Sequence, residues 1–562
     1  MVIGNVTQRI RNVKRLQQIL HIFAKYGFGY IVGRLNIDRN LVGRKIIKGI
    51  LAKKLNVFDI PAPVRIRKMM EELGPAFIKL GQILSTRPDL IPLEFCQELE
   101  KLQNEVPAFA YEKVKEQIEK ELKKPIDQLF QNFSVDSIAA ASLSQVHLAE
   151  SKSGEKLAVK VQRPDIEKTI RADLDILYML AQLAEKHIEE SRLYNPTAVV
   201  DEFKKTILKE INFSVEAKNI DRFRRNFKDD KTVYILKTIH QLSTKKILTM
   251  EKLDGIKADN VSEIEQIGLD RKQVAINGAD AILKQIFMHG FFHADPHPGN
   301  IFVLKDGRIA FLDFGMAGHI DAGTKEQLAD ILAAVIHRDV EGIIEAFISM
   351  GAVEQDAHVK CLSVDLMGFV ESYYEIPLKE LRMDQFLPDL INIISQNRIK
   401  VPPDFFLLSK ALITIEGVGK KISPDFNAVA QAKPFVERLV KERYSAKNIV
   451  REVKGFLKGL YILTNLLPRD LTIILNKIKK GTLHIEFEHR GLEDLISQMD
   501  KVSNRIAFSL VIAALIIGSS IVIQINKGPM FLDFPILGVI GFITAGIMGL
   551  WLAITILRSG KL

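Results

Sequence analysis

The chain has 562 residues, 47% of them hydrophobic and 26% charged, which is enough for two or more domains with a sizeable core. It contains only two cysteines, Cys96 and Cys361, so the sequence encodes neither a disulfide framework nor a zinc cluster. The net charge is +10, and residues 1–60 hold twelve of the 78 basic residues but only two of the 68 acidic ones. The excess positive charge therefore lies in the N-terminal tenth of the chain.

The first element in chain order is a basic amphipathic segment at residues 9–28, RIRNVKRLQQILHIFAKYGF. Such a segment suits an anionic membrane surface, although a solvated helix face or a nucleic-acid patch has a similar composition. We favour the membrane and expect no nucleic-acid partner, because the other end of the chain is strongly hydrophobic. The apolar run Ile19 to Phe23 is too short for a secretory signal peptide and has no cleavage site.

An amphipathic helix is predicted at residues 65–84, where Leu73, Phe77, Leu80 and Leu84 recur at helical spacing. Its other side presents Lys79 and Gln82, three residues apart. Further helices are predicted at about residues 93–103 and 111–122.

Residues 137–164 are predicted to form two strands around a Ser153-Gly154 turn. Lys160 lies in the second strand, in a pattern similar to the kinase strand whose lysine pairs with nucleotide phosphates. Upstream, residues 139–142 read Ala-Ala-Ala-Ser where a kinase has a glycine-rich loop. Alanine restricts the backbone, so we expect a stiffer loop that approaches the phosphates less closely.

A strong helical pattern at residues 201–227 carries Glu210 and Glu216, either of which could pair with Lys160. The interval before it has room for an additional charged helix at about residues 164–191. Leu248 to Glu251 closes a β-run and is predicted to form the hinge between two lobes.

Residues 291–315, FFHADPHPGNIFVLKDGRIAFLDFG, carry the clearest functional signal. Asp295 stands five residues before Asn300, and Asp313-Phe314-Gly315 follows a predicted hairpin. This HxDxxxxN spacing with a downstream DFG is typical of protein kinases. Asn300 and Asp313 offer the hard oxygen ligands that Mg²⁺ prefers, and Asp295 is the predicted catalytic acid or base.

Beyond Gly315 the periodicity is helical to about residue 425, followed by a charged helical extension at 426–500. Two uncharged segments then span Ile506 to Ile525 and Phe534 to Leu557, each long enough to cross a bilayer. Basic residues flank their outer ends, so we predict a hairpin with both ends in the cytoplasm. Gly541, Ala545 and Gly549 recur every four residues, which suits either packing between the two helices or a homodimer.

Several motifs, in this order along the chain, resemble those of the UbiB/ABC1/ADCK (COQ8-like) family of atypical kinases. They are Lys79-Leu80-Gly81-Gln82 with Ser85, Arg87, Pro88 and Asp89, the alanine-rich loop, the Lys160 strand, the helix at 210–223 and the HADPHPGN and DFG motifs. The match covers about residues 60–425, and the tandem apolar segments resemble bacterial, membrane-anchored members. The resemblance implies an α+β, protein-kinase-like two-lobed fold with extra N-terminal helices and a C-terminal two-helix transmembrane hairpin. Expected boundaries are 1–60 for the basic segment, 61–130 for the KxGQ-containing helices, 131–252 for the N-lobe, 253–425 for the C-lobe, 426–503 for the helical extension and 504–558 for the hairpin.

The resemblance also implies site roles. Asp295, Lys160 and Glu216 would be catalytic, and Asn300 and Asp313 would bind Mg²⁺. ATP or ADP would contact Ile138, Ala139, Ala140, Ala141, Ser142, Gln145, Val146, Lys160 and Glu251. The KxGQ gate would comprise Lys79, Gly81, Gln82, Glu210 and Asn212. The family pattern has an acid at the position of Asn212, so the Lys79 ion pair should be weaker here. It usually has a glycine at the position of Ser144, which is a second departure.

The function implied is that of an ATPase-like atypical kinase that supports isoprenoid quinone biosynthesis. It would act on the cytoplasmic side of the bacterial inner membrane, with anionic lipids, quinone intermediates and quinone-biosynthesis enzymes as partners. A phosphotransferase acting on a protein or small molecule is an alternative, because aminoglycoside and choline kinases share the HxDxxxxN spacing. A non-catalytic nucleotide-binding membrane scaffold is another.

Overall fold

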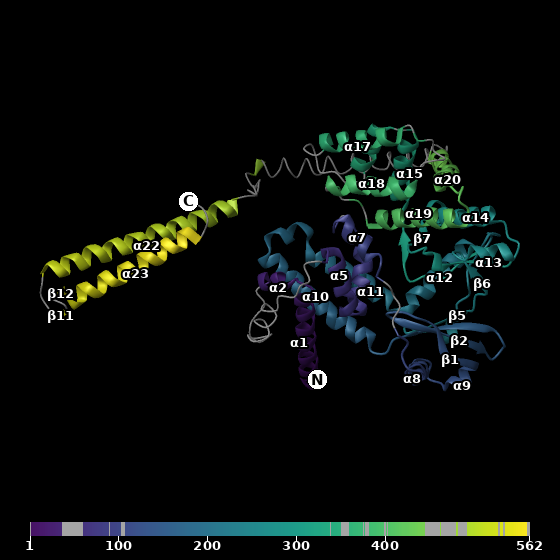
Figure 1. Cartoon of the computed structure of the whole chain (residues 1–562), viewed down its shortest axis with the longest axis horizontal. Coiled ribbons are helices and arrows are strands. Elements are labelled where there is room, and N and C mark those ends of the chain that lie inside the picture. Colours follow the sequence, from purple (N-terminus) through teal and green to yellow (C-terminus); the bar gives the residue numbers. More distant parts are fainter. Residues whose placement is uncertain are drawn as a thin grey trace. The chain divides into compact units, whose positions relative to one another are not determined.

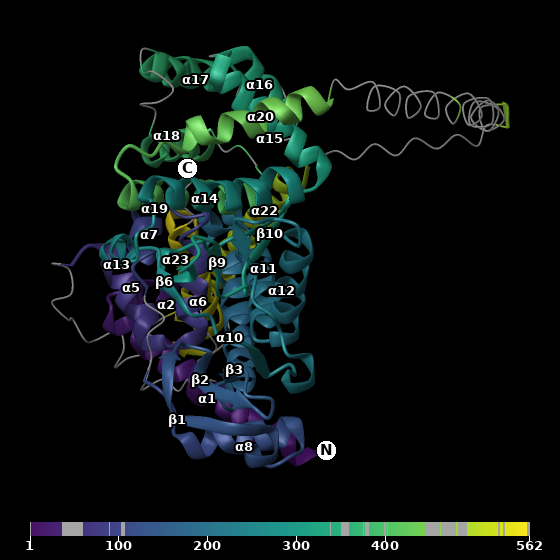
Figure 2. The same ribbon diagram turned by 90° about the vertical axis from the view of Figure 1, so that its right-hand side faces the viewer.

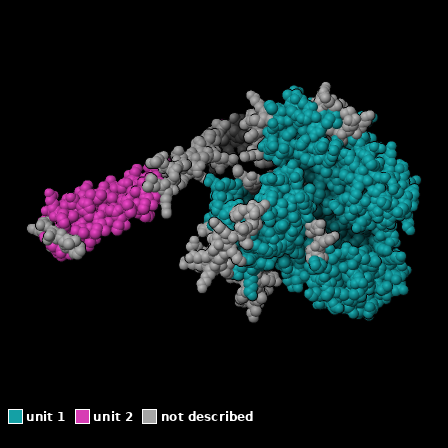
Figure 3. Space-filling view, viewed as in Figure 1, with its two compact units in different colours: residues 1–450 teal, residues 451–562 magenta. Residues whose placement is uncertain are grey.

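The computed structural model describes residues 2–35, 60–88, 90–102, 107–337, 339–349, 359–374, 376, 382–397, 399, 401, 403–443, 461, 479–480, 492–525, 529–531 and 534–558. Asp89, the second half of the basic N-terminal segment and most of the 426–503 extension lie outside these residues. The chain divides into two units, residues 1–450 and 451–562, coloured separately in Figure 3.

The small lobe is built on an antiparallel sheet of order β1-β2-β3-β5; Figure 2 labels its first three strands, β1, β2 and β3. Its strands are β1 (Phe130–Ala140), β2 (Ser144–Ser151), β3 (Lys156–Gln162) and β5 (Ile247–Glu251). Helices α8 (Tyr111–Leu122) and α9 (Ile126–Leu129) share a small core with this sheet, and α12 (Phe213–Asn226) contacts β5. Helix α8 coincides with the helix predicted at 111–122.

The large lobe begins with a second sheet of order β4-β9-β8-β6 and a two-stranded pair, β7 with β10. These strands are β4 (Val233–Tyr234), β6 (Gly255–Lys257), β7 (Phe291–His293), β8 (Ile301–Leu304), β9 (Ile309–Phe311) and β10 (Ala317–His319). The predicted catalytic hairpin is the β8–β9 pair, in which Ile301 is opposite Phe311.

Helices surround that sheet and share its large hydrophobic core. They are α13 (Val261–Gln266), α14 (Arg271–Leu283), α15 (Ala322–His337), α16 (Val340–Ser349), α17 (Val359–Tyr374), α18 (Met383–Gln396), α19 (Pro403–Ile422) and α20 (Ala428–Arg443). Helices α14 and α19 lie side by side (Figures 1 and 2). The two-lobed, kinase-like α+β architecture expected from the sequence is confirmed.

A separate helical layer accompanies the small lobe and has its own core. It combines α1 (Val2–Lys25), α2 (Gly29–Arg34), α5 (Ala62–Leu73), α6 (Pro75–Leu84) and α7 (Leu93–Leu99) with α10 (Ile166–His187) and α11 (Pro196–Glu210). Leu16, Ile19 and Leu20 of α1 are buried in this core. Part of the apolar face of the segment that we expected at a membrane surface is therefore packed inside the protein.

Two predicted helices are each divided into two. The helix predicted at 65–84 is α5 followed by α6, because Gly74 adopts a left-handed φ of 96° and Pro75 begins a new helix. The pattern at 201–227 is α11 followed by α12, because Asn212 leaves the helical conformation and caps α12. The second helix of each pair carries a side chain of the site described below, Lys79 on α6 and Glu216 on α12.

The second unit contains α22 (Leu492–Ile525) and α23 (Ile536–Arg558), joined by the short strands β11 (Met530–Phe531) and β12 (Phe534–Pro535). Val502–Ile525 and Ile536–Ile556 are long and apolar enough to cross a membrane. A Cβ at Gly541 would overlap Ser519 of α22, and Ala545 is buried, so these positions form the contact between the two helices. Gly549 has nothing within 4 Å of where its Cβ would be.

Candidate active site

Strand β3 and helix α12 place a lysine and a glutamate in contact at the base of the cleft. The Lys160 ammonium lies 2.9 Å from both carboxylate oxygens of Glu216 and 3.3 Å from Oδ1 of Asp313. Burial opposes the charge on Lys160, but attraction to Asp313 and Glu216 outweighs it and raises the lysine's pKa. Burial raises the pKa of Glu216 to about 7 despite the attraction of Lys160, and the charge of Asp313 adds to the rise.

The two carboxylates that share Lys160 differ in exposure. The Glu216 side chain is 5% exposed, whereas that of Asp313 is 56% exposed. The charge of Lys160 holds the pKa of Asp313 well below its usual range. Asp313 is therefore an ionised and exposed carboxylate, as a metal ligand must be.

The β8–β9 hairpin brings Asn300 beside the Asp313 segment, since the Leu312 amide donates to the Asn300 carbonyl at 2.8 Å. The Asn300 side-chain amide donates to the Asp295 carbonyl at 3.1 Å, which leaves its side-chain oxygen to accept another contact. One carboxylate, one amide oxygen and nucleotide phosphates form a donor set that suits Mg²⁺. The described residues contain no cluster of three or more His, Cys, Asp or Glu side chains that could hold a metal without a nucleotide.

Asp295 follows β7 by two residues, and its side chain is partly exposed. Its backbone amide donates to His293 Nδ1 at 3.2 Å, which fixes the start of the loop. Its carboxylate pairs at 3.1 Å with Lys410 of α19, and the two side chains are 40% and 31% exposed. We did not predict Lys410 from the sequence, although its signal is visible: it is a single cation within the apolar run FFLLSKALITI.

The KxGQ helix α6 brings a second lysine towards the same cleft. Lys79 pairs with Glu210 at the end of α11, and both side chains are largely buried. Burial opposes its charge, but attraction to Glu210 and Asp313 together raises the pKa of Lys79. Gly81 lets α6 pack closely, because a Cβ there would overlap Leu102 and Met70.

The other members of the predicted gate have structural partners. Gln82 donates to the Leu102 carbonyl at 3.2 Å. The Asn212 side-chain oxygen accepts from the Ser214 amide at 3.2 Å, which caps α12. Among the described contacts, Asn212 therefore supports the helix that carries Glu216, and Lys79 pairs with Glu210 alone.

The alanine-rich loop is a tight hairpin end. Ala139 and Ala140 lie in β1 opposite Val146 and Gln145, and the Ala141 amide donates to the Ser144 carbonyl at 2.7 Å. Ser142 is buried, and the next residue, Leu143, packs into the core of the N-terminal helical layer. The turn is thus anchored by the buried side chains of Ser142 and Leu143.

The remaining predicted nucleotide contacts have diverse surroundings. Ile138 is exposed on β1. The Gln145 side chain is buried, where it accepts from the Phe109 amide at 2.9 Å and donates to the Phe109 carbonyl at 3.2 Å. The Glu251 carboxylate accepts from the Tyr234 hydroxyl at 2.8 Å. Gln145 and Glu251 thus have protein partners for their side chains.

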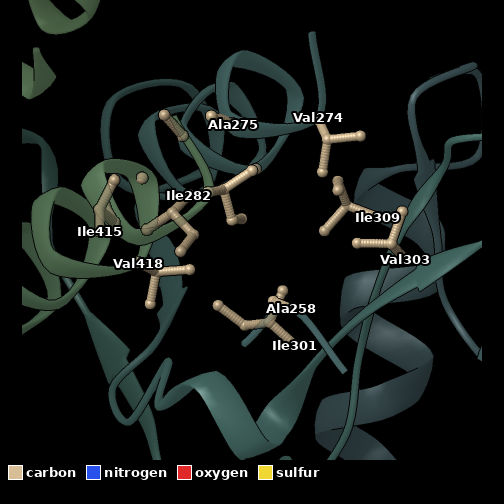
Figure 4. Close-up of a pocket in the computed structure, with 13 residues that line it drawn as sticks. Ala258, Val274, Ala275, Ile282, Ile301, Val303, Ile309, Ile415 and Val418 are labelled. Atoms are coloured by element: carbon tan, nitrogen blue, oxygen red, sulfur yellow. The ribbon is translucent and has the colours of Figure 1, made fainter. Parts of the chain in front are cut away.

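A small apolar pocket lies behind the catalytic hairpin (Figure 4). It is lined by Ala258, Val274, Ala275, Gly278, Ala279, Ile282, Ile301, Val303, Ile309, Ile415, Val418, Gly419 and Ile422. None of these residues carries a polar side chain, so the pocket offers no group for phosphoryl transfer. It lies where α14 and α19 support the strands that hold Asn300 and Asp313 in place.

Three family models and several curated proteins match this chain. Residues 101–347 match the ABC1 atypical kinase-like domain, 366–427 the UbiB helical domain and 490–558 the ABC1/UbiB kinase-like C-terminal domain. The "Uncharacterized protein in hydrogenase 1 5'region" of Clostridium pasteurianum is 34% identical over 98% of this chain and 100% of its own length. The "Probable protein kinase UbiB" of Marinobacter nauticus is 33% identical over 84% of this chain and 87% of its own. A solved structure, the Rv3197–erythromycin complex from Mycobacterium tuberculosis, aligns at a TM-score of 0.40 and 22% identity, over 60% of this chain and 92% of that one.

Proposed function

Because the chain belongs to the ABC1/UbiB family of atypical kinase-like proteins, we propose that it binds Mg²⁺–ATP and transfers the terminal phosphoryl group to water. We propose further that this hydrolysis supports isoprenoid quinone biosynthesis at the bacterial cytoplasmic membrane. Relatives in several bacteria carry the name "Probable protein kinase UbiB". In that setting the energy of hydrolysis would drive the handling of an apolar intermediate or the remodelling of partner enzymes.

The observation that carries the proposal is the Lys79–Glu210 pair beside the Lys160, Glu216 and Asp313 cluster. Two lysines flank the space where nucleotide phosphates would meet Asn300 and Asp313. In a protein kinase this cleft must also admit a peptide hydroxyl. Here α6 brings Lys79 close enough to Asp313 for their charges to interact, so we expect a small acceptor such as water to be favoured over a protein.

Asp295 and Lys410 supply complementary parts of the chemistry. Asp295 would orient the attacking water and accept its proton, as the catalytic aspartate of kinases does for a hydroxyl. Lys410 would neutralise the developing charge and hold the Asp295 carboxylate in place. Asn300 and Asp313 would hold Mg²⁺, which would supply positive charge to offset that of the phosphates.

The apolar helices α22 and α23 support membrane anchoring by their length and composition. The basic residues Lys501, Arg505 and Arg558 at their outer ends favour a cytoplasmic location for both ends. This orientation would place residues 1–450 on the side where ATP is available. Anionic lipids would then be the first partners that the basic N-terminal region meets.

Phosphate release from ATP tests the proposal. The full-length protein in nanodiscs, with and without anionic lipid and a phenolic quinone-precursor mimic, should release phosphate in a Mg²⁺-dependent manner. Asp313→Asn is the control, because it keeps the shape of the side chain and removes its charge. Release no faster than that of this control would refute the ATPase.

A second candidate function is phosphotransfer to a protein or small molecule, which the kinase names of the relatives favour. Radiolabel from ATP would then appear in a lysate component, and Lys79 or Gly81 substitutions should increase it by opening the acceptor side. The third candidate, a non-catalytic scaffold, predicts thermal stabilisation by nucleotide without turnover.

A further inference from the structure

Helix α12 contacts the metal-site segment through more than the Glu216–Lys160 pair. Glu216, Asn219 and Phe223 follow one another at intervals of three and four residues and therefore share one face of the helix. Glu216 meets Lys160, whereas Asn219 and Phe223 both meet the Asp313-Phe314-Gly315 segment. One rigid helix thus touches both the phosphate-binding lysine and the segment that carries the metal ligand.

The backbone contact is made by Asn219, whose side-chain nitrogen donates to the Phe314 carbonyl oxygen at 2.9 Å. A carbonyl oxygen can only accept, so this partner fixes the orientation of the Asn219 amide. The Phe314 ring packs against Phe223, with ring centroids 5.0 Å apart, and against His293 at 5.6 Å. Phe314 is therefore held by its backbone and its side chain at once.

Asp313 lies between two residues whose backbone carbonyl groups each accept a hydrogen bond from a side chain. Its predecessor, Leu312, accepts a hydrogen bond from His293 Nε2 at 2.9 Å, and its successor, Phe314, accepts from Asn219. Asp313 itself has a φ of 54°, in the left-handed region that non-glycine residues seldom adopt. A conformation of this kind persists only where its surroundings hold it, and these two bonds fix the peptide groups on either side.

We propose that Asn219 is a positioning residue for the metal site, because it fixes the backbone that follows Asp313. As a result, the Asp313 carboxylate takes its orientation when α12 is in the position that pairs Glu216 with Lys160. Movement of α12 away from Lys160 would pull on Phe314 and turn Asp313 away from Asn300. This proposal rests on the proposed binding of Mg²⁺–nucleotide. It assigns to Asn219 a function that concerns the metal and not the nucleotide itself.

The test measures the binding of AMP-PNP to the full-length protein in nanodiscs, by calorimetry, with and without Mg²⁺. Asn219→Ala removes the amide, and Asn219→Asp keeps the shape but presents an oxygen to the Phe314 carbonyl. Losing one hydrogen bond should raise the half-saturating Mg²⁺ concentration about twofold to tenfold in either variant. Affinity measured without Mg²⁺ should stay that of the wild type. Lys218→Ala, an exposed neighbour on the same helix, is the matched control and should change neither value.

Wild-type Mg²⁺ dependence in both Asn219 variants would overturn the proposal. An equal loss of affinity with and without Mg²⁺ would also overturn it, because Asn219 would then only support the cleft. If Asn219→Ala does not fold, the isosteric Asn219→Asp carries the same test. Absence of AMP-PNP binding by the wild type would instead refute the proposed function, on which this inference depends.

Discussion

Replacement of Lys79 by methionine tests the arrangement at the acceptor side of the cleft. Lys79 and Glu210 form an ion pair whose side chains are only 12% and 16% exposed. Methionine preserves most of the length and apolar area of lysine but removes the charge. The carboxylate of Glu210 would then lie largely buried with no cation within reach among the described contacts.

The expected cost follows from the burial of the pair. Removing one partner of a buried ion pair costs about 3–5 kcal/mol, because the other charge is left uncompensated. Both side chains retain some access to solvent, so we expect the lower end, about 3 kcal/mol in the free energy of unfolding of residues 1–450. The double variant Lys79→Met/Glu210→Gln should recover most of this loss, since no unpaired charge remains.

The assay is denaturant unfolding of the full-length protein in detergent, followed for wild type, both single variants and the double variant. Arg34→Ala serves as a control, because its partner, Glu190, is 70% exposed and such pairs contribute about 0–1 kcal/mol. A single-variant loss below about 1 kcal/mol, or a double variant no more stable than Lys79→Met, would refute the reasoning.

Three further predictions concern the cleft. In steady-state kinetics, Lys410→Met should lower kcat at least tenfold with little change in the KM for ATP, because the cation acts beside Asp295. Lys410→Arg keeps a cation and should restore part of kcat; equal losses in both variants would contradict this role of Lys410. Because the pKa of Glu216 is about 7, its carboxyl is neutral below that pH and cannot pair ionically with Lys160. We therefore expect kcat/KM to rise with pH up to about 7 and then level off. A Glu216→Gln variant that shows the same rise of kcat/KM with pH would exclude Glu216 as its source. Gly81→Leu should push α6 from its neighbours and lower stability by about 1–3 kcal/mol, measured as a fall in Tm.

The parts of the site that the sequence predicted well are those set by local spacing. The catalytic loop and its hairpin are encoded within residues 291–315, so Asn300 and Asp313 are neighbours once the β8–β9 hairpin forms. Lys160 was recognisable from its strand motif, and the structure places it against Glu216 and Asp313. In each case a short pattern carries both the element and the chemistry.

The parts that sequence reasoning missed depend on contacts between distant segments or on residues that end or begin a helix. Lys410 reaches Asp295 only because α19 packs beneath the catalytic loop, and no local pattern reports that packing. The Gly74-Pro75 pair was a readable stop signal within the predicted helix at 65–84. Asn212 was considered only as a partner for Lys79, whereas its preference for helix N-termini explains its cap on α12.

The central claim, that the phosphoryl acceptor is water, is tested most directly by a single turnover of ATP labelled in its terminal phosphate. The full-length protein in anionic nanodiscs is mixed in excess over the labelled nucleotide, and the label is followed into inorganic phosphate, protein and lipid. Nearly all of the label should appear as inorganic phosphate, and Asp295→Asn should suppress its release. Label that accumulates in protein or lipid, at a rate that Asp295→Asn lowers, would contradict this claim.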